Sequence, residues 1–289
     1  MASRLCELPI RGDLCQWPSP GQFVGTYSVT SFGGVGSTFL LEWLKGLQRA
    51  AQLPAASGCP SLLHGRLRHL VSCHINDDGP FKHLADPAVL SAFGPSHRAV
   101  YIVGSPTHAV ASVFRRRFQC WHFHRLHDCW FSRRQRNGRI PCEAPAVMRL
   151  RRVHGEEATT CRVPPVGPLA SVEAYAANGA DLFGMSDQFQ RWLSCNAPRC
   201  PFDVLVIRYE TLNASLPTLF DFLQMPLAVR ALFPFGRLRV ANQASSVGGA
   251  DEASEHLHRV MDSLEAATAR IPATGLWLRN ARSVAANAQ

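Results

Sequence analysis

The chain has 289 residues, of which 46% are hydrophobic, so it can bury one substantial core. A formal net charge of +9 and a pI near 9.3 indicate anionic partners, such as nucleotides, sulfated or phosphorylated substrates, nucleic acid or acidic lipid. No apolar run approaches the roughly 18 residues of a spanning helix, and the first residues contain no apolar signal segment, so we expect no membrane span and a cytoplasmic location.

The cysteines and lysines of the chain indicate its redox state and limit which residues could supply a catalytic lysine. Ten cysteines stand at irregular spacings, which in a chain without a secretion signal predicts reduced thiols rather than a disulfide framework. Only two of the 30 basic residues, Lys45 and Lys82, are lysines. Any reaction step that needs a lysine therefore has two candidates, and neither of them lies in the glycine-rich turn that opens the regular part of the chain.

This glycine-rich segment carries the strongest local signal. An expected strand over 25–30 runs into a turn with three glycines, and the hydroxyl residues Ser37 and Thr38 follow at the start of an expected helix over 37–50. Glycines allow the backbone to approach an anion closely, and a helix N-terminus adds amide donors and the positive end of its dipole. The segment predicts a phosphate-binding turn, although the lysine of the pattern G-x-x-x-x-G-K-[ST] is missing.

Periodicity assigns the rest of the chain. Further strand-like runs cover 67–73, 99–103 and 204–207, and further helices are expected over 107–118, 185–195, 216–223 and 252–269. Between about 119 and 170 the pattern dissolves into a basic stretch rich in Arg, His, Gly and Pro, which we interpret as an insertion in a single domain spanning 1–289. Strands that alternate with helices predict an α/β fold with three α/β/α layers and a central parallel sheet, whose ligands bind outside the carboxyl ends of the strands.

Three segments, in matching order and spacing, resemble the P-loop sulfotransferase family. TSFGGVGSTFLLEWL (30–44) is similar to the loop that binds the 5′-phosphosulfate, AVYIVGSPTHAVASVFRR (99–116) to the motif that binds the 3′ phosphate, and FDVLVIRYETLNASLPTLFDFL (202–223) to the late strand and its Tyr-Glu-Asp-Leu turn. The resemblance covers about 26–223 and is weak over 120–174. It implies a P-loop nucleotide-binding fold and transfer of a sulfuryl group from 3′-phosphoadenosine-5′-phosphosulfate (PAPS) to a hydroxyl or amine, without a metal.

The resemblance also implies roles for individual residues. His74 falls on the family's general base, a task that suits an imidazole because its pKa lies near neutrality. The residues carried over to the nucleotide are Gly33, Gly34, Gly36, Ser37 and Thr38 for its 5′ end, Phe39 for adenine stacking, Ser112, Arg237 and Arg239 for the 3′ phosphate, and Tyr209 near the nucleotide. Structural roles remain alternatives, with Phe39 as the first core residue of its helix, Tyr209 as an anchor of the strand end, and the arginines as solvated charges.

Three cations of the family pattern are missing. Gly34 and Ser72 stand where the family has lysines, and Gly104 stands where it has an arginine. A fixed cation at the transferring group commonly lowers the barrier by several kcal/mol, so its loss should slow the reaction by orders of magnitude unless arginines such as those at 115–117 replace it. A catalytically silent relative, which keeps the fold as a binding or interaction module, is therefore the alternative function.

Three further hypotheses compete with this interpretation. The segment 120–129 holds two cysteines and three histidines, enough ligands for zinc, but it lacks C-x-x-C spacing. The arginines and aromatic residues of 115–152 have a composition that suits single-stranded nucleic acid, but no recognised motif accompanies them, so nucleic acid is not expected as a partner. The missing loop lysine argues against an NTPase. The sequence identifies neither the acceptor nor the oligomeric state.

Overall fold

A computed structural model describes residues 26–52, 69–70, 82–127, 145–155, 166–225, 230, 233 and 252–280. The strands are β1 (Thr26–Ser31), β2 (His69–Leu70), β3 (Arg98–Val103), β4 (Asp203–Arg208) and β5 (Leu276–Leu278). The helices are α1 (Ser37–Gln52), α2 (Pro106–Arg115), α3 (Gln119–Leu126), α5 (Pro145–His154), α6 (Val172–Ala177), α7 (Met185–Leu193), α8 (Leu212–Phe222) and α11 (Glu252–Ala269), with the short 3₁₀ helices η3 (Pro87–Phe93) and η5 (Gly167–Leu169). Within these ranges no helix combines the length and apolarity needed to cross a membrane. Strands and helices alternate, so the expected α/β architecture is confirmed.

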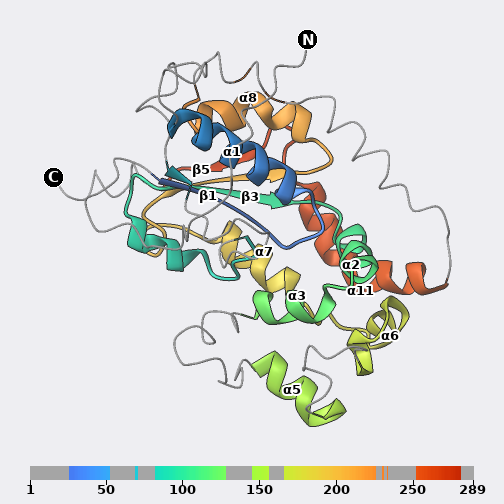
Figure 1. Cartoon of the computed structure of the whole chain (residues 1–289). Helices are drawn as coiled ribbons and strands as arrows, with labels where there is room; N and C mark the ends of the chain where they lie inside the picture. Colours follow the sequence, from blue (N-terminus) through green and yellow to red (C-terminus); the bar gives the residue numbers. More distant parts are fainter. Residues whose placement is uncertain are drawn as a thin grey trace.

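The five strands form one sheet in the order β2-β1-β3-β4-β5 (Figure 1). The first four are parallel, and the register places Arg98 between Tyr27 of β1 and Asp203 of β4. β5 runs antiparallel to β4, pairing Leu278 with Val204, and no sequence pattern predicted it. β2 lies on one side of β1, whereas β3 and β4 lie on the other, so the chain changes direction across the sheet at β1. Parallel α/β sheets bind ligands at the carboxyl edge beside such a point.

Helices cover the sheet on both sides, and their apolar faces build the core. Figure 1 shows α1 and α8 together on one side of the sheet and α7 on the opposite side. β3 is buried along 99–103, and the ring of Tyr101 stacks on Trp192 of α7 with centroids 4.8 Å apart. From α1, Leu40 and Leu44 are fully buried, as their four-residue spacing on one helix face predicts. The core thus fixes β1 and β3, whose carboxyl ends carry the candidate site.

β1 is buried although four of its six residues carry hydroxyl groups of Ser or Thr. His97, itself fully buried, contacts Thr26 Oγ1 through Nδ1 at 2.7 Å and Ser28 Oγ through Nε2 at 3.0 Å. A neutral imidazole offers one donor and one acceptor, so it can satisfy both hydroxyls at once. This pairing explains how Thr26 and Ser28 are accommodated in a strand that is buried along its whole length.

The stretch 119–170 is more regular in its described parts than the sequence pattern indicated. α3 buries Phe123 and Leu126, and α5 buries Val147 and Leu150. These apolar residues stand three apart, which is the spacing of one helix face. The many arginines and histidines around them in the sequence made this helical pattern of apolar residues difficult to recognise.

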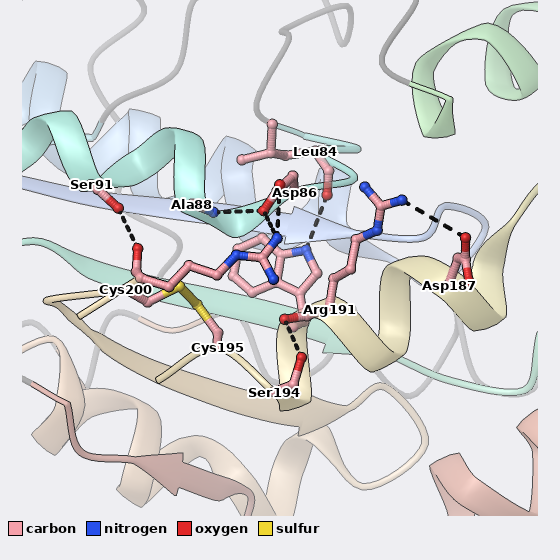
Figure 2. A network of polar contacts seen from close by, with 11 residues as sticks. Leu84, Asp86, Ala88, Ser91, Asp187, Arg191, Ser194, Cys195 and Cys200 are labelled. Atoms are coloured by element: carbon pink, nitrogen blue, oxygen red, sulfur yellow. Dashed lines mark hydrogen bonds and ion pairs between the residues drawn. A yellow bond between two sulfur atoms is a disulfide. The ribbon is translucent and has the colours of Figure 1, made fainter. Parts of the chain in front are cut away.

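Cys195 and Cys200 form a disulfide across the turn that follows α7 (Figure 2). Their Cα atoms are 5.5 Å apart, and both side chains are buried. Cys120 is also disulfide-bonded. The prediction of reduced thiols is therefore wrong for these three cysteines. Irregular spacing along the chain did not reveal that a turn brings two of them within bonding distance.

Candidate functional site

The glycine-rich turn lies at the carboxyl end of β1, directly before α1. Gly33, Gly34 and Gly36 have φ angles of 93°, 70° and 69°, in the region that favours glycine. The chain needs glycine at these positions to turn from β1 into α1. The structure therefore brings the predicted turn residues together at the edge where parallel α/β sheets bind ligands.

These glycines also allow close packing. A Cβ atom at Gly34 would lie 2.6 Å from the Cα atom of Ala109 in α2. A Cβ atom at Gly36 would lie 2.0 Å from the ring atom Cε2 of Tyr209. A side chain at Gly34 would therefore collide with the main chain of α2.

Hydrogen bonds inside the turn fix its shape. The Gly33 N–H donates to Ser31 Oγ at 3.1 Å, and the Ser31 hydroxyl donates to Ser37 Oγ at 2.9 Å. Both serines are buried, so the Ser37 hydroxyl is turned into the protein. Thr38 is only half-buried, and its hydroxyl is the one that meets a cation.

That cation is Lys82, which the sequence analysis did not place near the turn. Its Nζ donates to Thr38 Oγ1 at 2.7 Å, in the first turn of α1. The residue is only 8% exposed, and an ammonium that is shielded from water interacts more strongly with an anion than an exposed one does. The signal was present, because Lys82 is one of two lysines, but it lies 44 residues beyond Thr38 and in no motif.

The backbone around Lys82 is tied to β1 and α7. The Ser31 N–H donates to the Lys82 carbonyl at 2.8 Å. Two residues further on, the Leu84 carbonyl accepts from Nε1 of Trp192 at 3.0 Å and from Nε2 of Gln188 at 2.8 Å; Figure 2 shows the first of these bonds. These bonds fix the main chain from which the lysine extends, so its ammonium is positioned before any ligand arrives.

Two buried histidines pack against the turn. His83 Nδ1 bonds the carbonyl oxygen of Ser31 at 3.0 Å, His122 Nε2 bonds that of Phe32, and the two rings are 4.8 Å apart. Because a carbonyl only accepts, each imidazole donates its one N–H. A Cβ atom at Gly33 would lie 2.0 Å from Cε1 of His122, so this glycine makes room for the ring.

Burial sets the protonation state of this pair. It lowers the pKa of His122 to about 3 and lowers that of His83 well below its ordinary value, and the nearby cations act in the same direction. Both imidazoles are therefore neutral at neutral pH. A general base needs a pKa near the working pH and access to its substrate, so we assign both histidines a supporting role.

The predicted general base, His74, lies outside the described residues. The same holds for Ser72, Arg237 and Arg239. Their assignments stay predictions.

The other predicted nucleotide contacts are spread over the edge of the sheet. Tyr209 lies against the turn. Burial raises the pKa of its phenol, and the adjacent Glu210 raises this pKa further. Phe39 is half-buried and meets the ring of Phe233 edge to face, with centroids 5.8 Å apart, which fits the packing alternative. Ser112 lies six residues after the start of α2, about 9 Å along the helix axis.

The three arginines at 115–117 are exposed at the end of α2. Arg116 donates from Nε to the Ser112 carbonyl at 3.1 Å, and its guanidinium lies over the ring of Phe118 at 5.7 Å. It thus contacts its own helix and the residue beyond it. Among the described residues, the cation that bonds Thr38 at the glycine turn is Lys82.

Two carboxylates contact the loop that follows β3. The Ser105 N–H donates to Glu210 Oε1 at 2.7 Å. The Ser105 hydroxyl and the Thr107 N–H both donate to Glu265 Oε1, at 2.6 and 3.2 Å. A Cβ atom at Gly104 would lie 2.9 Å from Glu210 Oε1 and 2.9 Å from Val35 Cγ1, so a larger side chain here would require these neighbours to shift. The sequence analysis identified neither glutamate.

The histidine and cysteine cluster at 120–129 shows no metal centre in its described part. Cys120 is disulfide-bonded, His122 bonds a main-chain carbonyl, and Cys129 lies outside the described residues. Nowhere in the described ranges do three or more His, Cys, Asp or Glu side chains gather in a way that could hold a metal ion.

A cavity of about 340 Å³ lies beside α3 and α5. It is lined by Phe123, Arg149, Leu150, Val153, His154, Asn178, Ala180, Asp181 and Leu182. None of the turn residues lines it, so we treat it as separate from the candidate site.

No protein-family model matches the chain, and no curated protein is significantly similar to it in sequence. Any functional assignment therefore depends on the sequence segments and on the geometry at the carboxyl edge of the sheet.

Proposed function

We propose that the chain is a sulfotransferase-like protein with a three-layer, P-loop type nucleotide-binding fold. It would transfer a sulfuryl group from a nucleoside 5′-phosphosulfate, of which PAPS is the family example, to a hydroxyl or amine of an acceptor. The observation that carries the proposal is the Lys82 ammonium, 2.7 Å from Thr38 Oγ1 at the start of α1. It supplies a cation to a glycine turn that has no lysine of its own.

The chemistry requires such a cation. As the sulfuryl group moves, its S–O bond to the 5′ phosphate breaks, a new S–O or S–N bond to the acceptor forms, and the acceptor proton passes to a base, for which His74 is the expected residue. Negative charge develops on the oxygen that leaves with the phosphate. A preorganised ammonium, a hydroxyl and the N-terminus of α1 would stabilise this charge.

A transfer assay with a labelled phosphosulfate donor and a panel of hydroxyl and amine acceptors tests the proposal. We expect Lys82→Ala to lower the rate by roughly a hundredfold or more, the effect of losing one fixed donor at a developing oxyanion. Lys45→Ala is the matched control, because Lys45 lies on α1 and pairs with Glu42 at 3.1 Å. Equal rates for Lys82→Ala and wild type would contradict the proposal.

The alternative function, a nucleotide-binding module without transfer activity, is favoured by one observation. Both histidines that contact the turn are buried and have lowered pKa values, so they are weak bases and neither is suited to accept the acceptor's proton. Calorimetric titration with a nucleotide separates the two functions. Binding that depends on Lys82, without transfer to any acceptor, would support the alternative.

A further inference from the structure

The first turn of α2 is the second place at this edge where an anion is expected. α2 has 10 residues and begins with Ser105 as N-cap and Pro106 in its first turn. A helix N-terminus presents main-chain N–H donors and a positive dipole end. The family resemblance places the 3′ phosphate of the donor beside this helix.

In this protein the donors of that turn bind the protein's own carboxylates. Glu265 Oε1 accepts from the Ser105 hydroxyl at 2.6 Å and from the Thr107 N–H at 3.2 Å. Glu210 Oε1 accepts from the Ser105 N–H at 2.7 Å. Two negatively charged side chains therefore lie where an incoming phosphate would need the same donors.

Both glutamates are held in place. Glu265 belongs to α11, which lies beside α2 (Figure 1), and His258 of the same helix reaches Thr107 Oγ1 with its Nδ1 at 3.4 Å. Glu210 follows β4 directly, and its Oε2 lies 3.9 Å from Nε of Arg208. The packing of α11 and the end of a central strand therefore bring both carboxylates to the first turn of α2.

The loop also leaves little space for an arginine at position 104. A Cβ atom at Gly104 would lie 2.9 Å from Glu210 Oε1 and 2.9 Å from Cγ1 of Val35. The space in which an arginine would begin is filled by the carboxylate and by the glycine-rich turn. The lack of an arginine at position 104 and the presence of two carboxylates both weaken the binding of an anionic ligand here.

We infer that Glu210 and Glu265 make the donor site selective for a nucleoside 5′-phosphosulfate with a free 3′ hydroxyl. A carboxylate repels a phosphate but accepts a hydrogen bond from a hydroxyl, as acidic residues do with ribose in other nucleotide-binding α/β folds. The inference rests on the proposed function. The transfer step is unchanged by it: the 5′ S–O bond breaks, and the leaving group is the nucleoside 5′-monophosphate.

Calorimetry with the full chain tests this inference through two desulfated nucleotides, adenosine 5′-monophosphate and adenosine 3′,5′-bisphosphate. We expect wild type to bind the monophosphate about tenfold or more tightly than the bisphosphate. Glu265→Gln should reduce this preference several-fold by improving the binding of the bisphosphate. Glu255→Gln, which removes the same charge from an exposed position of α11, should leave the preference unchanged.

The outcomes separate this inference from the proposed function. Tighter binding of the bisphosphate by wild type would overturn the inference and leave the proposed function standing. A preference for the monophosphate that survives in both Glu265→Gln and Glu210→Gln would also overturn it, because the glutamates would then not set the selectivity. If neither nucleotide binds, the proposed function fails and the inference fails with it. The preference is the ratio of two affinities measured on the same variant. A general loss of stability weakens both affinities and therefore does not produce the expected change in the ratio.

Discussion

The ring of Tyr209 lies where a side chain at Gly36 would have to extend. A Cβ atom at this glycine would be 2.0 Å from Cε2 and 2.7 Å from both Cδ2 and Cζ of the tyrosine. Tyr209 follows β4, and its N–H donates to the Val103 carbonyl at the end of β3 at 2.7 Å. The contact therefore links the loops of three parallel strands, β1, β3 and β4, along the carboxyl edge.

We predict that Gly36→Ala destabilises the protein and disrupts the candidate site. The glycine has a φ of 69°, which an alanine adopts only with strain of about 1–3 kcal/mol, and the added methyl group collides with the tyrosine ring. The free energy of unfolding in urea should fall by at least that amount, and nucleotide binding should weaken in parallel.

Gly46→Ala is the control for this substitution. Gly46 lies in α1, and a methyl group added there would have no neighbouring atom within 4 Å outside its own helix backbone, so alanine should stabilise the helix by about 0.5–1 kcal/mol. The double variant Gly36→Ala with Tyr209→Ala removes the collision and keeps the strain, so it separates the two effects. A Gly36→Ala variant as stable as wild type would show that the turn does not pack as described.

We predict that Gly34→Lys, which introduces the lysine that the proposed resemblance calls for, harms the protein rather than activates it. The Cβ atom of the new side chain would lie 2.6 Å from the main chain of Ala109, so α2 would have to move away from the turn. Gly179→Lys is the matched variant, because Gly179 has a similar φ of 73° but open surroundings. It should cost about 1 kcal/mol from backbone strain alone, and Gly34→Lys should cost clearly more in the same urea titration. Faster sulfuryl transfer by Gly34→Lys would contradict this account.

The sequence predicted those helices and strands whose pattern of apolar residues and glycines lies within one short stretch of the chain. The helix expected over 252–269 matches α11, because its apolar residues follow one helix face without interruption. The strand expected over 25–30 and the turn after it were also found, since glycines mark the reversal. β5 was missed because three half-buried residues at the antiparallel edge carry too little pattern.

The candidate site was only partly predictable, because several of its contacts join residues that are distant in the sequence. The glycine turn could be located from its own composition. Lys82 could not be assigned, since its approach to Thr38 depends on the bonds that tie 82–84 to β1 and α7. Glu265 reaches Ser105 across a separation of 160 residues, and only the packing of α11 on α2 brings them together.

A further prediction concerns the disulfide between Cys195 and Cys200. Cleavage by trypsin after Arg191, Arg199 and Arg208 should release WLSCNAPR and CPFDVLVIR as one linked species under non-reducing conditions, and reduction should separate them. Closing so short a loop should stabilise the fold by about 2 kcal/mol. Recovery of both peptides alkylated at cysteine without prior reduction would show that the bond is absent.

The buried histidines predict a loss of stability in mild acid. His122 has a folded-state pKa of about 3, whereas an unfolded chain titrates its histidines near pH 6.5, so between these values the unfolded state binds more protons. Stability is therefore complete above about pH 7.5 and falls as the pH drops through 6.5. At about pH 5 this one residue should cost roughly 2 kcal/mol, and His83, whose pKa is also lowered, adds to the effect.

Urea unfolding at a series of pH values measures this slope. His122→Gln keeps an N–H that can donate to the Phe32 carbonyl but removes the titrating group, so the slope between about pH 7 and pH 5 should decrease by about one proton. A wild-type stability that stays flat down to about pH 5 would mean that His122 is accessible to protons in the folded state, and the tight contact between its ring and Gly33 would then be wrong.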